Sequence, residues 1–206
     1  MTITFSAVIL AGGQARRMGG VDKGLQLFRN QPLFEHIYQR LQPQIADIAI
    51  NANRNQQRYA QSGLPVFSDD LAGFQGPLSG ILTALQRAQS NFVLFVPCDC
   101  PFFPMDLFAK LKHAVISQHA QLAYAHDGER EHPTFCLVST SLAPALAQYL
   151  ATGERRMLTF MQQQHAIALD FSATPDAFKK YQQLSRSADV NHIPILYLLK
   201  DVQEIG

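Results

Sequence analysis

The sequence of 206 residues contains few charged residues, and their charges almost cancel. Charged residues make up 16% of the chain, and 17 lysines and arginines stand against 16 aspartates and glutamates, which leaves a net charge of +1. Such a balance gives no general attraction to nucleic acid or to an anionic membrane, so phosphate recognition requires a local cluster of cations. Hydrophobic residues account for 47% of the chain, which is typical of a globular protein and excludes wholesale disorder.

Long apolar runs and cysteines are also scarce. No run reaches the roughly 20 apolar residues of a transmembrane helix, and the apolar run near the start lacks the basic leader of a signal peptide. The three cysteines, Cys98, Cys100 and Cys136, are an odd number and are expected to be reduced thiols. Cys98 and Cys100 do not have the Cys-x-x-Cys spacing of common zinc sites. We therefore expect a cytoplasmic protein with no membrane or nucleic-acid partner.

The chain has no internal repeat of 20 to 50 residues and no low-complexity linker, so we expect a single domain spanning residues 1–206. Apolar strands alternate with helical patterns from Ile3 to at least Leu150. This alternation predicts an α/β fold, a three-layer α/β/α sandwich with a mainly parallel central sheet. Strands are predicted over residues 5–10, 45–50, 91–97, 121–125 and 135–138, helices over 32–41, 56–61, 105–115 and 142–150, and a second glycine-rich loop over 73–80 before another helix.

The most informative stretch is the glycine-rich loop LAGGQARRMGGVDK, which runs from Leu10 to Lys23. It follows a short apolar run that is typical of a buried parallel strand. Glycine lets successive backbone N–H groups converge on an anion, and Arg16, Arg17 and Lys23 add the charge that suits a triphosphate. The loop matches neither the dinucleotide fingerprint nor the P-loop. The alternative interpretation is an ordinary strand-to-helix turn with scattered surface arginines.

Polar residues follow three further apolar strands, at Asn51, Asp69 and Asp99. Ligands of open α/β sheets collect beyond the carboxyl ends of the strands, so these residues are candidates for a binding site. The residues alone slightly favour a turn-forming role for Asn51 and Asn53, and they leave Asp99 as either a helix cap or a metal ligand. With a triphosphate loop upstream, Asp99 is favoured as the ligand of Mg²⁺.

The glycine loop resembles the signature of nucleotidyltransferases with a Rossmann-like fold, in which Leu-Ala-Gly-Gly is followed by Arg-Met-Gly and a lysine. Within that superfamily, the chain resembles the molybdenum cofactor guanylyltransferases over residues 8 to about 178. Three motifs carry this resemblance: Gly-Gly-Val-Asp-Lys-Gly in the loop, the strand ending Pro-Cys-Asp-Cys-Pro, and the later Gly-Glu-Arg-Arg. The resemblance implies transfer of GMP from GTP to the terminal phosphate of molybdenum-bearing molybdopterin, with Mg²⁺ as cofactor and pyrophosphate as product. It also implies contact with other molybdenum cofactor biosynthesis proteins and recipient molybdoenzymes.

The resemblance assigns roles to individual residues. The implied catalytic residues are Arg17, Lys23 and Asp99, and Asp99 is also the implied metal ligand. The implied nucleotide-binding residues are Leu10, Ala11, Gly12, Gly13, Lys23, Asn51, Asp69 and Asp99. The implied acceptor-binding residues are Arg155, Arg156 and Asn191. In-line attack at the α-phosphorus requires positioning and neutralisation of charge rather than a covalent nucleophile. The residues alone leave the arginine pair equally interpretable as surface partners of Glu154.

Two stretches limit the resemblance. The polar segment 126–133 is either a solvated turn or the side of the cleft that faces the pterin. Residues 179–184 stand where the family has its Phe-x-Asn-x-Asn-Thr-Pro motif, so the chain is atypical from about residue 179. The segment around Asn191 resembles that motif but lies later in the sequence. If Asn191 is not equivalent to the family's asparagine, a polar contact to metal or pterin phosphate is lost. The alternatives are a molybdopterin cytidylyltransferase, a sugar-phosphate nucleotidyltransferase, or a non-catalytic protein that delivers the cofactor.

Overall fold

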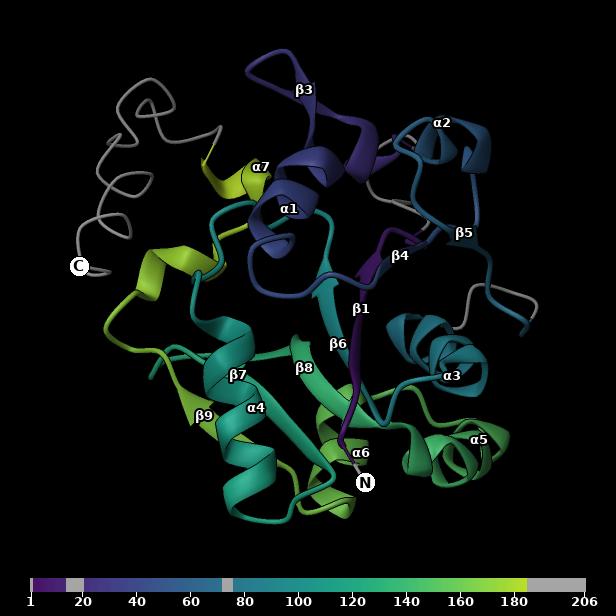
Figure 1. Ribbon diagram of the computed structural model, residues 1–206, viewed down its shortest axis with the longest axis vertical. Coiled ribbons are helices and arrows are strands. Elements are labelled where there is room, and N and C mark those ends of the chain that lie inside the picture. Colours follow the sequence, from purple (N-terminus) through teal and green to yellow (C-terminus); the bar gives the residue numbers. More distant parts are fainter. Residues whose placement is uncertain (1, 14–20, 72–75, 185–206) are drawn as a thin grey trace.

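A seven-stranded sheet forms the centre of the protein, with the strand order β5-β4-β1-β6-β8-β7-β9 (Figure 1). The computed structural model describes residues 2–13, 21–71 and 76–184. Strand β8 is antiparallel to both of its neighbours, β6 and β7, whereas the other neighbouring strands of the sheet pair in parallel. The predicted mainly parallel sheet is therefore confirmed.

The elements have the following bounds. The strands of the sheet are β1 (Phe5–Leu10), β4 (Ile48–Asn51), β5 (Val66–Phe67), β6 (Phe92–Pro97), β7 (Leu122–His126), β8 (Glu131–Ser139) and β9 (Ile167–Asp170), and a small hairpin joins β2 (Leu27–Phe28) to β3 (Gln31–Pro32). The helices are α1 (Leu33–Leu41), α2 (Gln56–Ala60), α3 (Pro77–Arg87), α4 (Leu107–Ser117), α5 (Ala143–Ala151), α6 (Met157–Gln163) and α7 (Tyr181–Leu184), with 3-10 turns η2 (Lys23–Leu25), η3 (Thr140–Leu142) and η4 (Pro175–Phe178).

Helices cover both faces of the sheet, because successive side chains of a strand point to opposite sides. Ala7 and Ile9 of β1 pack in one apolar cluster with α1, α2 and α4. Val8, which lies between them in the sequence, packs in a second cluster with α3, α5 and α6. The two clusters make the three layers that the alternating sequence pattern predicts (Figure 1).

Three predicted boundaries were wrong by three residues or more. The strand expected over 45–50 begins only at Ile48, because the preceding residues close α1, with the amide of Ile45 donating to the carbonyl of Leu41. Helix α3 begins at Pro77, inside the predicted loop 73–80, as suits a proline in a first helical turn. Strand β8 begins at Glu131, so half of the polar stretch is paired with β7 rather than forming a solvated turn.

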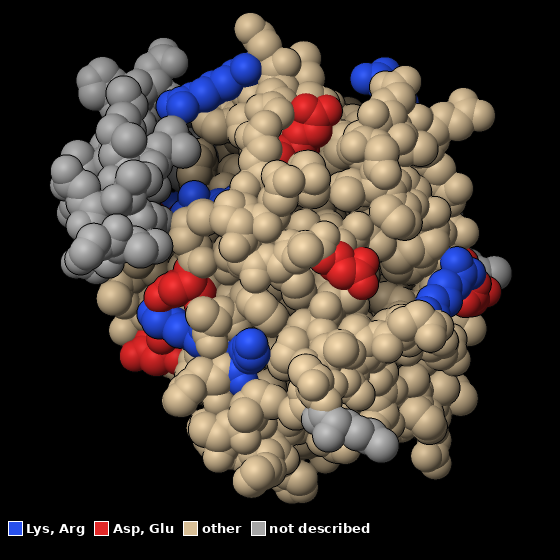
Figure 2. All heavy atoms as spheres, in the orientation of Figure 1, with Lys and Arg blue, Asp and Glu red and all other residues tan. Residues whose placement is uncertain are grey.

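The described residues include no helix that is long and apolar enough to cross a membrane. On the face shown in Figure 2, basic and acidic side chains lie scattered among each other. Cys98, Cys100 and Cys136 are buried free thiols.

Candidate functional site

The carboxyl ends of β1, β4 and β6 meet at one edge of the sheet and bring the predicted nucleotide-binding residues together. Leu10 is in register with Asn51 of β4 on one side and with Pro97 of β6 on the other. Beyond the strands, the amide of Ala11 donates to the carbonyl of Asn51 at 2.8 Å, and the amide of Cys98 donates to the carbonyl of Leu10 at 3.1 Å. The glycine loop therefore starts between the segments that carry Asn51 and Asp99.

Asn53 and Arg54 hold the first glycines of the loop. The side-chain amide of Asn53 donates to the carbonyl of Gly12 at 3.2 Å, and its oxygen accepts from the amide of Asp69 at 2.8 Å. The guanidinium of Arg54 donates to the carbonyl of Gly13 at 3.1 Å. Asn53 is thus a bridge between the loop and the end of β5, a role that the interpretation as a turn former missed because its partners are distant in sequence.

Asn51, which is buried, and Asp69, which is partly buried, form a hydrogen-bonded pair beside the loop. The Nδ2 of Asn51 donates to the Oδ1 of Asp69 at 2.8 Å, and Asn51 is only 2% exposed as the last residue of β4. Helix α3 passes close to this pair, since a Cβ at Gly80 would lie 2.3 Å from the Oδ1 of Asn51. Asn51 is therefore a buried, hydrogen-bonded strand residue rather than a turn former.

Lys23 and Asp99 form an ion pair on the other side of the loop. The Nζ of Lys23 lies 3.0 Å from the Oδ2 of Asp99, with the lysine side chain 30% exposed and the aspartate side chain 10% exposed. Partial burial acts to lower the pKa of Lys23, but Asp99 outweighs it and raises the pKa above its usual value. Lys23 is therefore a cation at neutral pH, held at the tip of the central strands.

The chemistry around Asp99 fits Mg²⁺ only if a substrate supplies further ligands. Within residues 2–13, 21–71 and 76–184, no three acidic, histidine or cysteine side chains gather as a metal cluster. Mg²⁺ is commonly held by one or two carboxylates together with water and substrate phosphates, so a lone carboxylate beside a loop that is predicted to bind phosphate suits this ion. Burial raises the pKa of Cys98 and Cys100 well above the usual thiol value, which keeps both thiols protonated in the folded protein.

The interpretation of Asp99 as a helix cap has no support in its contacts. Its Oδ2 accepts from Lys23, and its Oδ1 accepts a weak hydrogen bond from the thiol of Cys100 at 3.6 Å. Neither contact is with an amide of the following helix.

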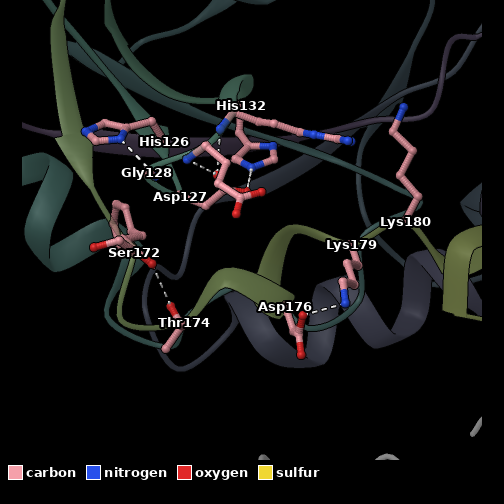
Figure 3. A network of polar contacts seen from close by, with 12 residues as sticks. His126, Asp127, Gly128, His132, Ser172, Thr174, Asp176, Lys179 and Lys180 are labelled. Carbon is pink, nitrogen blue, oxygen red and sulfur yellow. Dashed lines mark hydrogen bonds and ion pairs between the residues drawn. The ribbon is translucent and has the colours of Figure 1, made fainter.

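A second polar group lies where β7 and β8 meet (Figure 3). The Oδ2 of Asp127 lies 2.7 Å from the Nε2 of His132, and the imidazole stacks on the ring of Phe178, with centroids 4.6 Å apart. Burial acts to raise the pKa of Asp127, but hydrogen bonds from His132 and from the amides of Arg130 and Glu129 outweigh it and hold this pKa at about 2. The polar stretch is thus an ordered group of side chains.

The atypical segment after Phe178 returns to the end of β6. The amide of Tyr181 donates to the carbonyl of Asp99 at 2.8 Å, and its hydroxyl donates to the carbonyl of Leu27 at 3.2 Å. Figure 3 shows Lys179 pointing to Asp176, whereas the side chain of Lys180 points away from it. The segment therefore brings the backbone of Tyr181, directly after Lys180, to Asp99, where the resemblance expects an asparagine-bearing motif.

Four predicted residues are not among those that the described structure brings together at this site. Arg17 and Asn191 lie outside the described residues. Arg155 lies in the connection between α5 and α6, where its guanidinium donates to the carbonyls of Leu150 and Glu154 at 2.8 and 2.6 Å. The contact with Glu154 is thus to its backbone rather than to its carboxylate, and the exposed Arg156 immediately precedes α6. The roles of these four residues stay predictions.

Comparison with known proteins gives a consistent result. The sequence model of the family described as the MobA-like NTP transferase domain matches residues 7–167. The chain is 97% identical over 184 residues to a molybdenum cofactor guanylyltransferase of Pasteurella multocida, covering 89% of this chain and 97% of the relative. It is 66% identical over 191 residues to a protein of the same name from Mannheimia succiniciproducens, covering 93% and 99% of the two chains.

Solved structures share the fold at low sequence identity. A molybdopterin-guanine dinucleotide biosynthesis protein A from Archaeoglobus fulgidus superposes with a TM-score of 0.68 at 17% identity, covering 87% of this chain and 88% of that one. A nucleotidyl transferase from Methanothermobacter gives a TM-score of 0.67 at 17% identity, covering 95% and 98%.

Proposed function

The chain belongs to the molybdenum cofactor guanylyltransferases, within the MobA-like NTP transferases, and we propose that its sheet-edge site transfers GMP from GTP to molybdenum-bearing molybdopterin. The observation that carries the assignment of this site is the pair of Lys23 and Asp99, 3.0 Å apart beside the glycine loop. A cation and a carboxylate at this position suit a triphosphate and its metal ion.

The proposed reaction is an in-line displacement. An oxygen of the terminal phosphate of molybdopterin attacks the α-phosphorus of GTP, the bond to the bridging oxygen of the β-phosphate breaks, and pyrophosphate leaves with the electron pair. Lys23 neutralises charge on the phosphate oxygens, and the amides of Gly12 and Gly13 hold the triphosphate. Asp99 would hold Mg²⁺, which supplies further neutralisation of phosphate charge when bound.

The remaining residues position the two substrates. Asn51 and Asp69, fixed to each other at 2.8 Å, would contact the nucleoside. Asn53 and Arg54 hold the carbonyls of Gly12 and Gly13, which leaves the amides of this segment available for phosphate. The acceptor would lie toward Asp127, His132 and the segment at Lys180. Arg17, Arg155, Arg156 and Asn191 stay candidates for phosphate or acceptor contacts.

One incubation tests this function against its alternatives. Purified protein with Mg²⁺, labelled GTP and molybdopterin should produce pyrophosphate and a labelled guanine dinucleotide in equal amounts. Unlabelled CTP or UTP at the same concentration should compete poorly, whereas strong competition by CTP would indicate a cytidylyltransferase. Tight nucleotide binding without pyrophosphate would indicate a delivery protein that hands the cofactor to a recipient molybdoenzyme, and would refute the proposal.

A further inference from the structure

We infer that Tyr59 is a positioning residue that holds Lys23 in place through Asp22, an inference that rests on the proposed reaction. Tyr59 belongs to α2, which packs on the sheet. Along the sequence, α2 is far from the glycine loop. Its hydroxyl donates to the Oδ1 of Asp22 at 2.5 Å. Asp22 immediately precedes Lys23, so the contact joins the core of the protein to the lysine of the site.

Asp22 is held by two donors from the same region. Besides Tyr59, the Nδ2 of Asn55 donates to its Oδ2 at 2.9 Å. The carbonyl of Asp22 accepts from the amide of Leu25 at 3.2 Å, which closes the 3-10 turn that begins at Lys23. Both carboxylate oxygens and the carbonyl of Asp22 therefore accept hydrogen bonds. These bonds hold the backbone that carries Lys23.

The turn also lies directly on the tyrosine. A Cβ at Gly24 would be 2.4 Å from the hydroxyl oxygen of Tyr59, so only glycine allows this approach. Tyr59 itself is 0% exposed, and its ring packs edge-on against Phe34 with centroids 4.9 Å apart. The ring of Tyr59 is thus fixed in the core, and its hydroxyl contacts the turn that carries Lys23.

The hydroxyl of Tyr59 stays a donor at all working pH values. Burial is the largest cause that raises its pKa far above the usual value, and the nearby Cys98 and the hydrogen bond to Asp22 act in the same direction. Replacing Tyr59 by phenylalanine keeps the ring in the core and removes only this donor. Among the described residues, the carboxylate of Asp22 then keeps only the donor on Asn55, and the turn should hold Lys23 less firmly beside Asp99.

The test is a double-mutant cycle between Tyr59→Phe and Lys23→Ala, measured as single-turnover transfer from labelled GTP. We expect Tyr59→Phe to lower the transfer rate about tenfold, because a misplacement of about 1 Å in a catalytic site can cost up to ~100-fold. In the Lys23→Ala background the same substitution should cause no further loss, because the group that it positions is gone. Tyr38→Phe, which removes the hydroxyl of a half-buried tyrosine on α1, is the matched control and should keep the full rate.

A purely structural role for Tyr59 gives a different result. Full activity of Tyr59→Phe, or an equal tenfold loss in both backgrounds, would overturn the inference. If Tyr59→Phe fails to fold, Asn55→Gly removes the other donor at an exposed position whose φ of 50° suits glycine. It should show a smaller loss that also disappears with Lys23→Ala. Absence of transfer by the unaltered protein would instead count against the proposed function.

Discussion

Replacing Gly80 of helix α3 by alanine should damage the proposed nucleotide site, because α3 packs against Asn51. Gly80 lies in the first turn of α3, where an added Cβ would be 2.3 Å from the Oδ1 and 2.9 Å from the Cγ of Asn51. Both atoms belong to a side chain that is 2% exposed and bonded to Asp69, so Asn51 has little room to move. The substitution should push Asn51 aside and break its hydrogen bond to Asp69.

Two opposite effects set the size of the change in stability. Alanine is favoured over glycine inside a helix by about 1 kcal/mol. Loss of a buried hydrogen bond that leaves its partners unsatisfied costs about 1 to 3 kcal/mol. The expected result for Gly80→Ala lies between no net change and a loss of about 2 kcal/mol, which lowers Tm by up to ~8 °C for a chain of this size.

The binding of GTP should suffer more than the fold, because Asn51 and Asp69 are expected to contact the nucleoside. A loss of about 1.4 kcal/mol at this pair corresponds to tenfold weaker binding, which titration calorimetry with GTP and Mg²⁺ would measure. Gly13→Ala is the control for stability, since an added Cβ there meets none of the described residues within 4 Å. If Gly80→Ala raised Tm and bound GTP normally, the close packing of α3 on Asn51 would be refuted.

Two further predictions follow from the shifted pKa values. Because the pKa of Asp127 is held at about 2, below its value of about 3.9 in the unfolded chain, its contribution to stability is present above pH 4 and is lost as pH falls toward 2. The difference in unfolding free energy between the unaltered protein and Asp127→Asn should therefore narrow as pH falls from about 4, and urea titrations that found a constant difference would contradict this. Because burial raises the pKa of Cys98, Cys100 and Cys136, the folded protein should resist alkylation by iodoacetamide at pH 8 and react with it in denaturant, whereas rapid labelling of the folded protein would show that the thiols are accessible.

Local patterns in the sequence were sufficient to predict the central strands of the sheet and much of its polar edge, but not the edge strand β9. A glycine loop, an asparagine and an aspartate each follow an apolar strand, and parallel pairing of β4, β1 and β6 brings these strand ends together. The meeting of Lys23 with Asp99 follows from this arrangement. The antiparallel start of β8 at Glu131 was not predicted, because its polar residues lack the apolar alternation that identifies a strand.

The supporting contacts could not be predicted from local patterns. Tyr59 and Asp22 are 37 residues apart, and nothing near either residue indicates the other. Asn53 bridges Gly12 and Asp69 through side-chain contacts that span 41 and 16 residues. Such contacts depend on how helices and loops pack, which the spacing of residue types along the chain does not determine.

The most direct test of the site is transfer of label from α-labelled GTP to molybdopterin by the protein and by Lys23→Ala. Lys23 is 30% exposed and contributes little to the apolar core, so the variant should fold and unfold as the unaltered protein does. We expect its single-turnover rate to fall by about two to three orders of magnitude, as is usual when a group that stabilises charge in the transition state is removed. Transfer at a near-normal rate by a folded Lys23→Ala variant would contradict the central claim that the pair of Lys23 and Asp99 acts on the triphosphate.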